Sequence, residues 1–164
     1  PSQSRTGDLG SAVAQALAGT GLSPTSLELE VTEDILLHDE QGALNTFLEI
    51  QELGVRLVFD DFGTGFASLS YLKKFPLDGL KIDRSFVLGL LTDADDAAIV
   101  SSTIGLSKQL GLSVIAEGIE DRATADFLVR MGCAEGQGYF FGRPMPANEF
   151  EAKFLTAPAA AEVA

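Results

Sequence analysis

The feature that most constrains the fold is a regular alternation of strand-like and helix-like segments along most of the chain. Short apolar or alternating runs predict strands, and longer segments of helical periodicity that stop at glycines separate them. The expected strands are 27–31, 55–60, 77–83, 112–117 and 135–140, and the expected helices are 8–19, 42–53, 95–110, 122–131 and one beginning near 146 or 147. Units of roughly 25 to 35 residues are typical of parallel β/α architecture.

Composition places the chain among single globular domains. Its 164 residues are 46% hydrophobic, which is enough for one sizeable core. No apolar run approaches the roughly 20 residues that a membrane-spanning helix needs, so we expect a soluble segment without membrane contact. One cysteine, Cys133, excludes an internal disulfide and is compatible with a reducing, cytoplasmic location. Its apolar neighbours predict a small core residue.

The charge balance limits the classes of ligand. The chain carries 24 acidic and 11 basic residues, a net charge of -13, which argues against binding to a nucleic-acid polymer. An anionic ligand would have to be attracted locally, by metal ions, a well-placed lysine or backbone amides.

Charged or amide side chains stand at the carboxyl ends of all five expected strands. They are Glu30 with Glu33, Asp60 with Asp61, Lys81 with Asp83, Glu117 with Glu120, and Gln137. Each alone has a structural explanation, such as a helix cap or an ion pair, and Asp60-Asp61 before glycines also fits an Asx turn. Because the carboxyl ends of parallel strands meet on one rim, the whole set favours a functional site.

The residue types on that rim indicate metal chemistry. Adjacent carboxylates raise each other's pKa unless positive charge lies between them, and a divalent cation supplies that charge. Oxygen ligands without a His or Cys cluster favour Mg²⁺ or Mn²⁺, and His38 is expected in an exposed polar stretch. Two cations with a nearby lysine suit phosphodiester hydrolysis, and nothing resembles a serine or cysteine triad or a phosphate loop.

Five sequence motifs then carry a resemblance to a known family. They are Leu29-Glu30-Val31-Thr32-Glu33, Asp60-Asp61-Phe62-Gly63-Thr64-Gly65, Leu80-Lys81-Ile82-Asp83, Ala116-Glu117-Gly118-Ile119-Glu120 and Gln137-Gly138-Tyr139-Phe140-Phe141-Gly142-Arg143-Pro144. In this order and spacing they resemble the signature motifs of the EAL-domain family, the bacterial cyclic-di-GMP phosphodiesterases. The resemblance spans about residues 8–154.

The resemblance implies a (β/α)₈ barrel of the TIM type that cuts cyclic di-GMP to linear pGpG with two Mg²⁺ or Mn²⁺ ions. It implies that Glu30 binds the first metal, that Asp60 bridges both, and that Asp61 binds the second. The further implied roles are Glu117 as ligand of the second metal or general base, Lys81 as the residue that orients water and stabilises charge, Gln137 and Asp83 as substrate-binding residues, and Glu33, Thr64, Gly65 and Glu120 as supports of the loop 62–68.

The sequence also departs from the family pattern. The Glu-Ala-Leu motif and a metal-binding Asn of the family lie upstream of the first motif found here, and this chain has neither. We therefore expect residues 1–155 to form the C-terminal part of the barrel domain, strands four to eight, with a flexible tail at 156–164. An incomplete barrel predicts no useful turnover by these residues alone. The resemblance further implies a homodimer and an upstream sensory or cyclase domain.

Two other functions remain open at this stage. A catalytically silent cyclic-di-GMP receptor would follow if the upstream ligands were replaced. An interaction scaffold unrelated to the nucleotide predicts no rise in melting temperature with ligand, whereas either binding function predicts one.

Overall fold

The computed structural model describes residues 6–33, 35, 39–63 and 69–155. Five parallel strands form one sheet in sequential order, β1 (Glu28–Val31), β2 (Arg56–Phe62), β3 (Gly79–Ile82), β4 (Ser113–Ala116) and β5 (Glu135–Gly136). The helices are α1 (Thr6–Thr20), α3 (Glu40–Glu52), α4 (Leu69–Lys74), α5 (Arg84–Gly89), α6 (Ala94–Leu110), α7 (Arg122–Met131) and α8 (Ala147–Phe150), with a 3₁₀ turn at Pro24–Ser26 and a π-helical turn, η2, at Glu151–Leu155.

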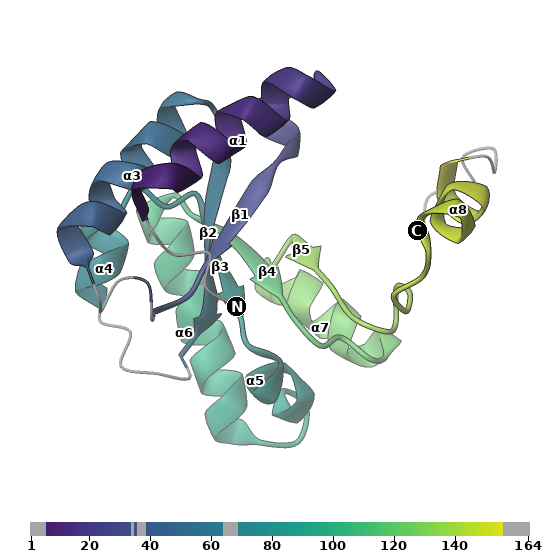
Figure 1. The fold of residues 1–164 in the computed structure, drawn as a ribbon. Helices are drawn as coiled ribbons and strands as arrows, with labels where there is room; N and C mark the ends of the chain where they lie inside the picture. Colours follow the sequence, from purple (N-terminus) through teal and green to yellow (C-terminus); the bar gives the residue numbers. More distant parts are fainter. Residues whose placement is uncertain (1–5, 34, 36–38, 64–68, 156–164) are drawn as a thin grey trace.

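The arrangement is that of an open, curved β/α sheet. In Figure 1 the strands run through the centre of the view, with α3 and α4 on the left, α1 across the top, and α5, α6 and α7 in the lower part. Strands β1 and β5 stand at the two ends of the sheet. The segment with α8 lies apart from the sheet, on the right of the view. The alternation predicted from the sequence is therefore the architecture of the described chain.

Two apolar clusters hold all the described α-helices except α8 against the sheet. The first joins α3 and the α4 region to β2 and β3 and centres on Phe47, Leu57 and Phe59, each at most 1% exposed. The second joins α6 and α7 to β3 and β4 and includes Val100 and Ile104. Burial on both faces of the middle of β2 is what parallel β/α sheets require, since helices cover one face and the barrel interior the other.

Several helix ends follow local capping rules. Asp39, Asp93 and Asp121 each accept a backbone N–H bond at the start of α3, α6 and α7. Gly111 and Gly132 end α6 and α7 in the left-handed conformation that favours glycine. These caps explain why the helix boundaries predicted from the sequence lie within a few residues of the observed ones.

Polar side chains tie the amino ends of the strands together. Arg56 on β2 lies 3.3 Å from Glu28 on β1, 4.0 Å from Glu135 on β5, and donates to Ser113 on β4 at 2.8 Å. Asp78 accepts the backbone N–H of Leu57 at 2.8 Å. The arginine thus links four strands of the sheet at the end opposite to the carboxylate-rich rim.

The expectations from the sequence need two corrections. The fifth strand is Glu135–Gly136 only, because residues 138–142 form a turn in which Phe141 and Gly142 both donate to the carbonyl of Gly138. Two six-residue helices, α4 and α5, follow β2 and β3 where no helix was predicted. The lone cysteine, Cys133, is buried as expected. The expectations for His38 and for the tail 156–164 lie outside the described residues.

No helix in the described ranges has the length and apolar character needed to cross a membrane.

Candidate active site

Lys81 is the centre of the predicted rim. It lies on β3, whose four residues are all buried, and its side chain is only 4% exposed. Its ammonium lies 2.7 Å from Glu30 Oε1, 3.2 Å from Asp60 Oδ1 and 2.5 Å from Glu117 Oε1. These carboxylates come from β1, from β2 and from the residue after β4. Four neighbouring elements of the sheet therefore bring their charged groups to one point.

The lysine remains charged in this setting. Burial by itself lowers the pKa of Lys81, but hydrogen bonds to Glu117, Glu30 and Asp60 outweigh burial and raise the pKa above its ordinary value. A permanent ammonium accordingly faces the three carboxylates.

Asp60 and Asp61 present their carboxylates to the same region. Adjacent residues of a regular strand point to opposite faces. Asp61, however, has φ 55, the left-handed conformation that is uncommon for a non-glycine residue, and its N–H donates to Asp60 Oδ1 at 3.0 Å. One oxygen each from Asp60, Asp61 and Glu117 lies within 4.8 Å of the others. The left-handed turn is thus what permits neighbours in sequence to share one site.

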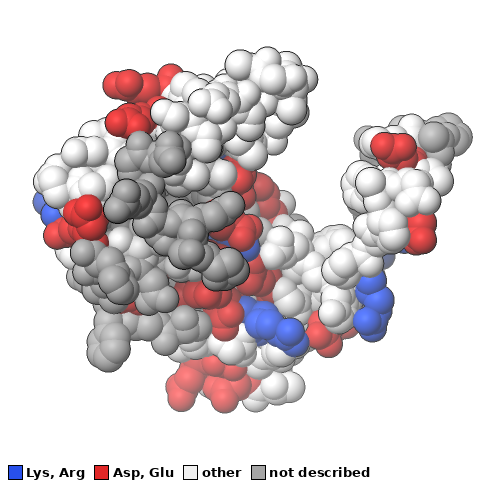
Figure 2. Space-filling model, in the orientation of Figure 1, with Lys and Arg blue, Asp and Glu red and all other residues white. Residues whose placement is uncertain are grey.

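These three carboxylates fit a divalent cation. Burial raises the pKa of Asp61, and the charges of Asp60 and Asp83 raise it further. Unfavourable crowding of anions of this kind is relieved by a cation, and an all-oxygen donor set suits Mg²⁺ or Mn²⁺. Figure 2 shows acidic side chains spread over this face of the molecule, with few lysines and arginines among them.

Gln137 extends the cluster to the last strand. It follows β5, and its Nε2 donates to Glu117 Oε1 at 2.6 Å. Glu117 Oε1 therefore accepts from both Gln137 and Lys81. The structure brings together the predicted residues Glu30, Asp60, Asp61, Lys81, Glu117 and Gln137.

The other predicted residues lie around this centre. Asp83 caps α5, accepting from Ser85 N at 2.9 Å and from the Ser85 hydroxyl, and these bonds outweigh the effect of burial and lower its pKa. Glu120 lies 3.7 Å from Arg84, the first residue of α5. Glu33 Oε1 is buried without a hydrogen-bond partner among the described residues. Thr64 and Gly65 fall outside the described residues, so the predicted role of their loop stays a prediction.

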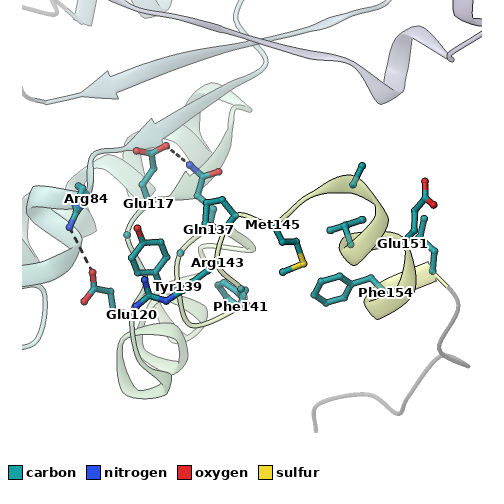
Figure 3. A pocket seen from close by; sticks show the side chains of 17 residues that line it. Arg84, Glu117, Glu120, Gln137, Tyr139, Phe141, Arg143, Met145, Glu151 and Phe154 are labelled. Carbon is teal, nitrogen blue, oxygen red and sulfur yellow. Dashed lines mark hydrogen bonds and ion pairs between the residues drawn. The ribbon is translucent and has the colours of Figure 1, made fainter.

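A cavity that the sequence reading missed adjoins Glu117 and Gln137. Its volume is about 1040 Å³, and it runs between the turn after β5 and the segment with α8. Figure 3 shows Glu117 and Gln137 at one end and Phe154 at the other. The Arg143 guanidinium lies 4.3 Å from the centre of the Tyr139 ring. Aromatic and arginine side chains in the stretch 139–143 were the sequence signal for a ligand cavity here.

Two loops that carry Glu117 and Gln137 are joined through their backbones. Gln137 N donates to Ala116 O at 2.9 Å, Ile119 N to Gln137 O at 3.1 Å, and Phe140 N to Ile119 O at 3.0 Å. Gly138 packs directly on Ile119, and an added Cβ there would overlap the backbone oxygen and nitrogen of Ile119. The close packing of the two loops, and with it the relative position of the Glu117 and Gln137 side chains, thus requires glycine at position 138.

Replacing Gly138 by alanine is expected to lower the free energy of unfolding by about 1 to 3 kcal/mol, because the backbone of Ile119 has to move. Thermal melting of the variant measures this loss. Gly105 in α6 is the matched control, since its added Cβ meets nothing within 4 Å. Gly105→Ala is expected to raise stability by about 0.5 to 1 kcal/mol. Equal melting temperatures for the two variants would contradict the packing argument.

Comparison with known proteins identifies this arrangement. The sequence model of the EAL domain matches residues 1–144. The chain belongs to the EAL domain family. The predicted fold class, an α/β barrel of the TIM type that this chain contains in part, is confirmed by that match and by the structural similarity of EAL domains to the chain.

Relatives and solved structures of EAL proteins resemble the chain closely. It is 46% identical over 137 residues to the bifunctional diguanylate cyclase/cyclic di-GMP phosphodiesterase MucR of Pseudomonas aeruginosa, covering 84% of this chain and 20% of MucR. The structure of the PaMucR phosphodiesterase in a c-di-GMP complex superposes with a TM-score of 0.81 at 45% identity, covering 87% of this chain and 58% of that one. Klebsiella pneumoniae BlrP1, in a manganese/c-di-GMP complex, superposes with a TM-score of 0.77 at 31% identity, covering 84% and 35%.

The extent of these matches bears on function. The EAL chain described here spans about a fifth of the length of the curated relatives it matches. The matches show the family of this chain, and the activity of the whole protein belongs to the proposal below.

Proposed function

We propose that this EAL chain supplies most of the catalytic rim of a metal-dependent phosphodiesterase that hydrolyses cyclic di-GMP to linear pGpG. The observation that carries the proposal is the convergence of Glu30, Asp60 and Glu117 on the buried Lys81, with Asp61 beside them. Similarity to relatives named as cyclic-di-GMP phosphodiesterases and to nucleotide complexes supports the choice of substrate.

The carboxylates would hold two Mg²⁺ or Mn²⁺ ions. Asp60, Asp61 and Glu117 are the three whose oxygens lie close enough together to share a cation, and Glu30 is the half-exposed carboxylate that also contacts Lys81. When bound, divalent cations lower the pKa of water and neutralise charge on a phosphodiester. The manganese complex of BlrP1 supports this choice of ion.

The remaining catalytic and binding roles are assigned to residues of this chain. Lys81 and Gln137 both donate to Glu117 Oε1, and these two bonds orient that carboxylate in the rim. We assign Glu117 as ligand of the second metal or general base, and Lys81 as the group that orients water and offsets phosphoryl charge. Gln137 and Asp83 are assigned to substrate binding. Glu33, Glu120, Thr64 and Gly65 are assigned to support of the loop 62–68.

The assembly around the chain is also part of the proposal. Strands β1 and β5 end an open sheet, and a TIM-type barrel needs eight strands to close. We therefore propose that residues 1–155 form the C-terminal part of the barrel domain, and that the chain alone turns over little substrate. A homodimer, an upstream sensory or cyclase domain and a cytoplasmic location complete the proposal.

Two measurements test the proposal. The 164-residue chain is titrated with cyclic di-GMP, with Mn²⁺ and with excess chelator, and its melting temperature is followed. A hybrid in which the part of PaMucR phosphodiesterase before the matched segment precedes Pro1 is then assayed for pGpG by chromatography. We expect a metal-dependent rise in melting temperature for the chain and hydrolysis by the hybrid alone.

The other outcomes separate the competing functions. A hybrid that binds the nucleotide without cleaving it would indicate a silent receptor. No ligand-dependent change in melting temperature would indicate a scaffold, and nucleotide affinity unchanged by chelator would contradict the metal-bridged site. Normal turnover by the 164 residues alone would contradict the need for further strands.

A further inference from the structure

Lys81 shares its partners with the cation that the site is proposed to bind. Its ammonium contacts Asp60 Oδ1 and Glu117 Oε1, and the same two residues belong to the group of three carboxylates whose oxygens lie within 4.8 Å of one another. Glu30 is its third partner. Two of the three candidate metal ligands are thus already paired with a positive charge of the protein itself.

The position of Lys81 makes this pairing persistent. Its side chain is 4% exposed, whereas those of Asp60 and Glu117 are 18% and 16% exposed, so the ammonium has little access to water as an alternative partner. Each residue of β3 is buried, which fixes the stem of the lysine in the sheet. Among the described residues, every ion pair of Glu30, Asp60 and Glu117 is made with Lys81.

In the absence of metal, Lys81 offsets part of the negative charge on the rim. Glu30, Asp60, Asp61 and Glu117 carry four negative charges in one region, and carboxylates this close destabilise one another without a cation. A buried charge is tolerated only when it is paired and hydrogen-bonded, and the three carboxylate contacts satisfy that condition for the Lys81 ammonium. The lysine therefore stabilises the folded, metal-free rim.

We propose that Lys81 is a built-in counter-cation that weakens divalent-metal binding, because a metal ion must compete with its ammonium for Asp60 and Glu117. The proposal rests on the metal-dependent function proposed above. Its opposite is that Lys81 strengthens metal binding by holding the carboxylates in place. The two alternatives predict opposite changes in metal affinity when the Lys81 charge is removed. In the first, affinity rises because the ammonium no longer repels the metal ion; in the second, affinity falls because the carboxylates are no longer held in place.

The test is the Mn²⁺ affinity of the 164-residue chain with Lys81→Met, which keeps the apolar stem and removes the charge. Isothermal titration calorimetry is expected to give a dissociation constant at least about tenfold lower than that of the unaltered chain. Without metal the variant is expected to melt at a lower temperature, and saturating Mn²⁺ is expected to raise its melting temperature by more than it raises that of the unaltered chain.

Lys74 offers a matched control. It also pairs with a glutamate, at 2.6 Å from Glu40, but its side chain is 43% exposed and lies on α4, outside the rim. Lys74→Met makes the same change in net charge, and its Mn²⁺ affinity is expected to stay within about twofold of that of the unaltered chain, because exposed charges are screened. A tenfold gain in Mn²⁺ affinity for Lys74→Met would mean that net charge causes the effect, and it would overturn the proposal.

A folded Lys81→Met variant with unchanged or weaker Mn²⁺ binding would overturn the proposal and leave the phosphodiesterase function standing. If the variant does not fold, Mg²⁺ titration of the unaltered, ¹⁵N-labelled chain decides. The ammonium signal of Lys81 is expected to shift with the midpoint of metal binding, and a signal unchanged at saturation would refute the competition. An unaltered chain that binds neither ion would overturn the metal-dependent function itself.

Discussion

Asp60→Asn is expected to weaken Mn²⁺ binding by the chain at least about 100-fold, and to reduce pGpG formation by the PaMucR hybrid at least as strongly. Replacing residues that only support metal ligands already costs 10- to 100-fold in affinity, so loss of a direct ligand should cost more. Asparagine keeps the shape of the side chain but removes the charge that faces Lys81 at 3.2 Å. Calorimetry with Mn²⁺ and chromatography of the product measure the two effects.

Asp126→Asn is the control for this substitution. Asp126 lies on α7, 3.5 Å from Arg122, and its side chain is 52% exposed. The same chemical change there is expected to leave Mn²⁺ affinity within about twofold, because a screened surface pair contributes little. Asp60→Asn with the Mn²⁺ affinity of the unaltered chain would show that Asp60 is no metal ligand, and the assignment of the site would have to change.

The sequence was enough to predict that the site residues lie together, because the carboxyl ends of parallel strands all lie at the same edge of the sheet. Periodicity located β1 to β4 within two or three residues, and the end of each strand then placed Glu30, Asp60, Lys81 and Glu117 on one rim. Neither inference needed a side-chain conformation. The EAL family model matches residues 1–144, which include these four positions.

The detailed geometry did not follow, because it depends on single backbone and side-chain conformations. Strand alternation would separate Asp60 from Asp61, and only the left-handed φ of Asp61 lets them share a site. Asp83 looked like a rim residue in the sequence, but it also lies two residues before Ser85 and caps α5. Glu120 contacts Arg84, a partner 36 positions earlier in the chain that sequence spacing does not predict.

Short elements were missed for a related reason. Helices α4 and α5 have six residues each, too few for a helical period to stand out from the flanking turns. Residues 137–140 have the composition of a strand, yet contacts distant in sequence decide their structure, since Phe140 donates to Ile119 O and Gly138 packs on Ile119. Tertiary packing overrides local preference where an element is short.

Phe47→Ala is expected to lower the free energy of unfolding by about 3 to 5 kcal/mol, the usual cost of removing a fully buried phenylalanine. Phe47 is 1% exposed, and its ring meets Phe75 edge to face at 5.5 Å in the cluster that holds α3 against β2. Urea denaturation should show a lower midpoint with an unchanged slope.

The next residue of the same helix separates packing from helix propensity. Leu48 is 44% exposed, and Leu48→Ala makes a comparable truncation there, with an expected cost below about 1 kcal/mol. Because β2 carries Asp60 and Asp61, loosening the cluster around Phe47 is also expected to weaken Mn²⁺ binding when urea is raised toward the lowered midpoint. Equal losses of stability for Phe47→Ala and Leu48→Ala would mean that the cluster does not fix β2, and the rim would then need another structural support.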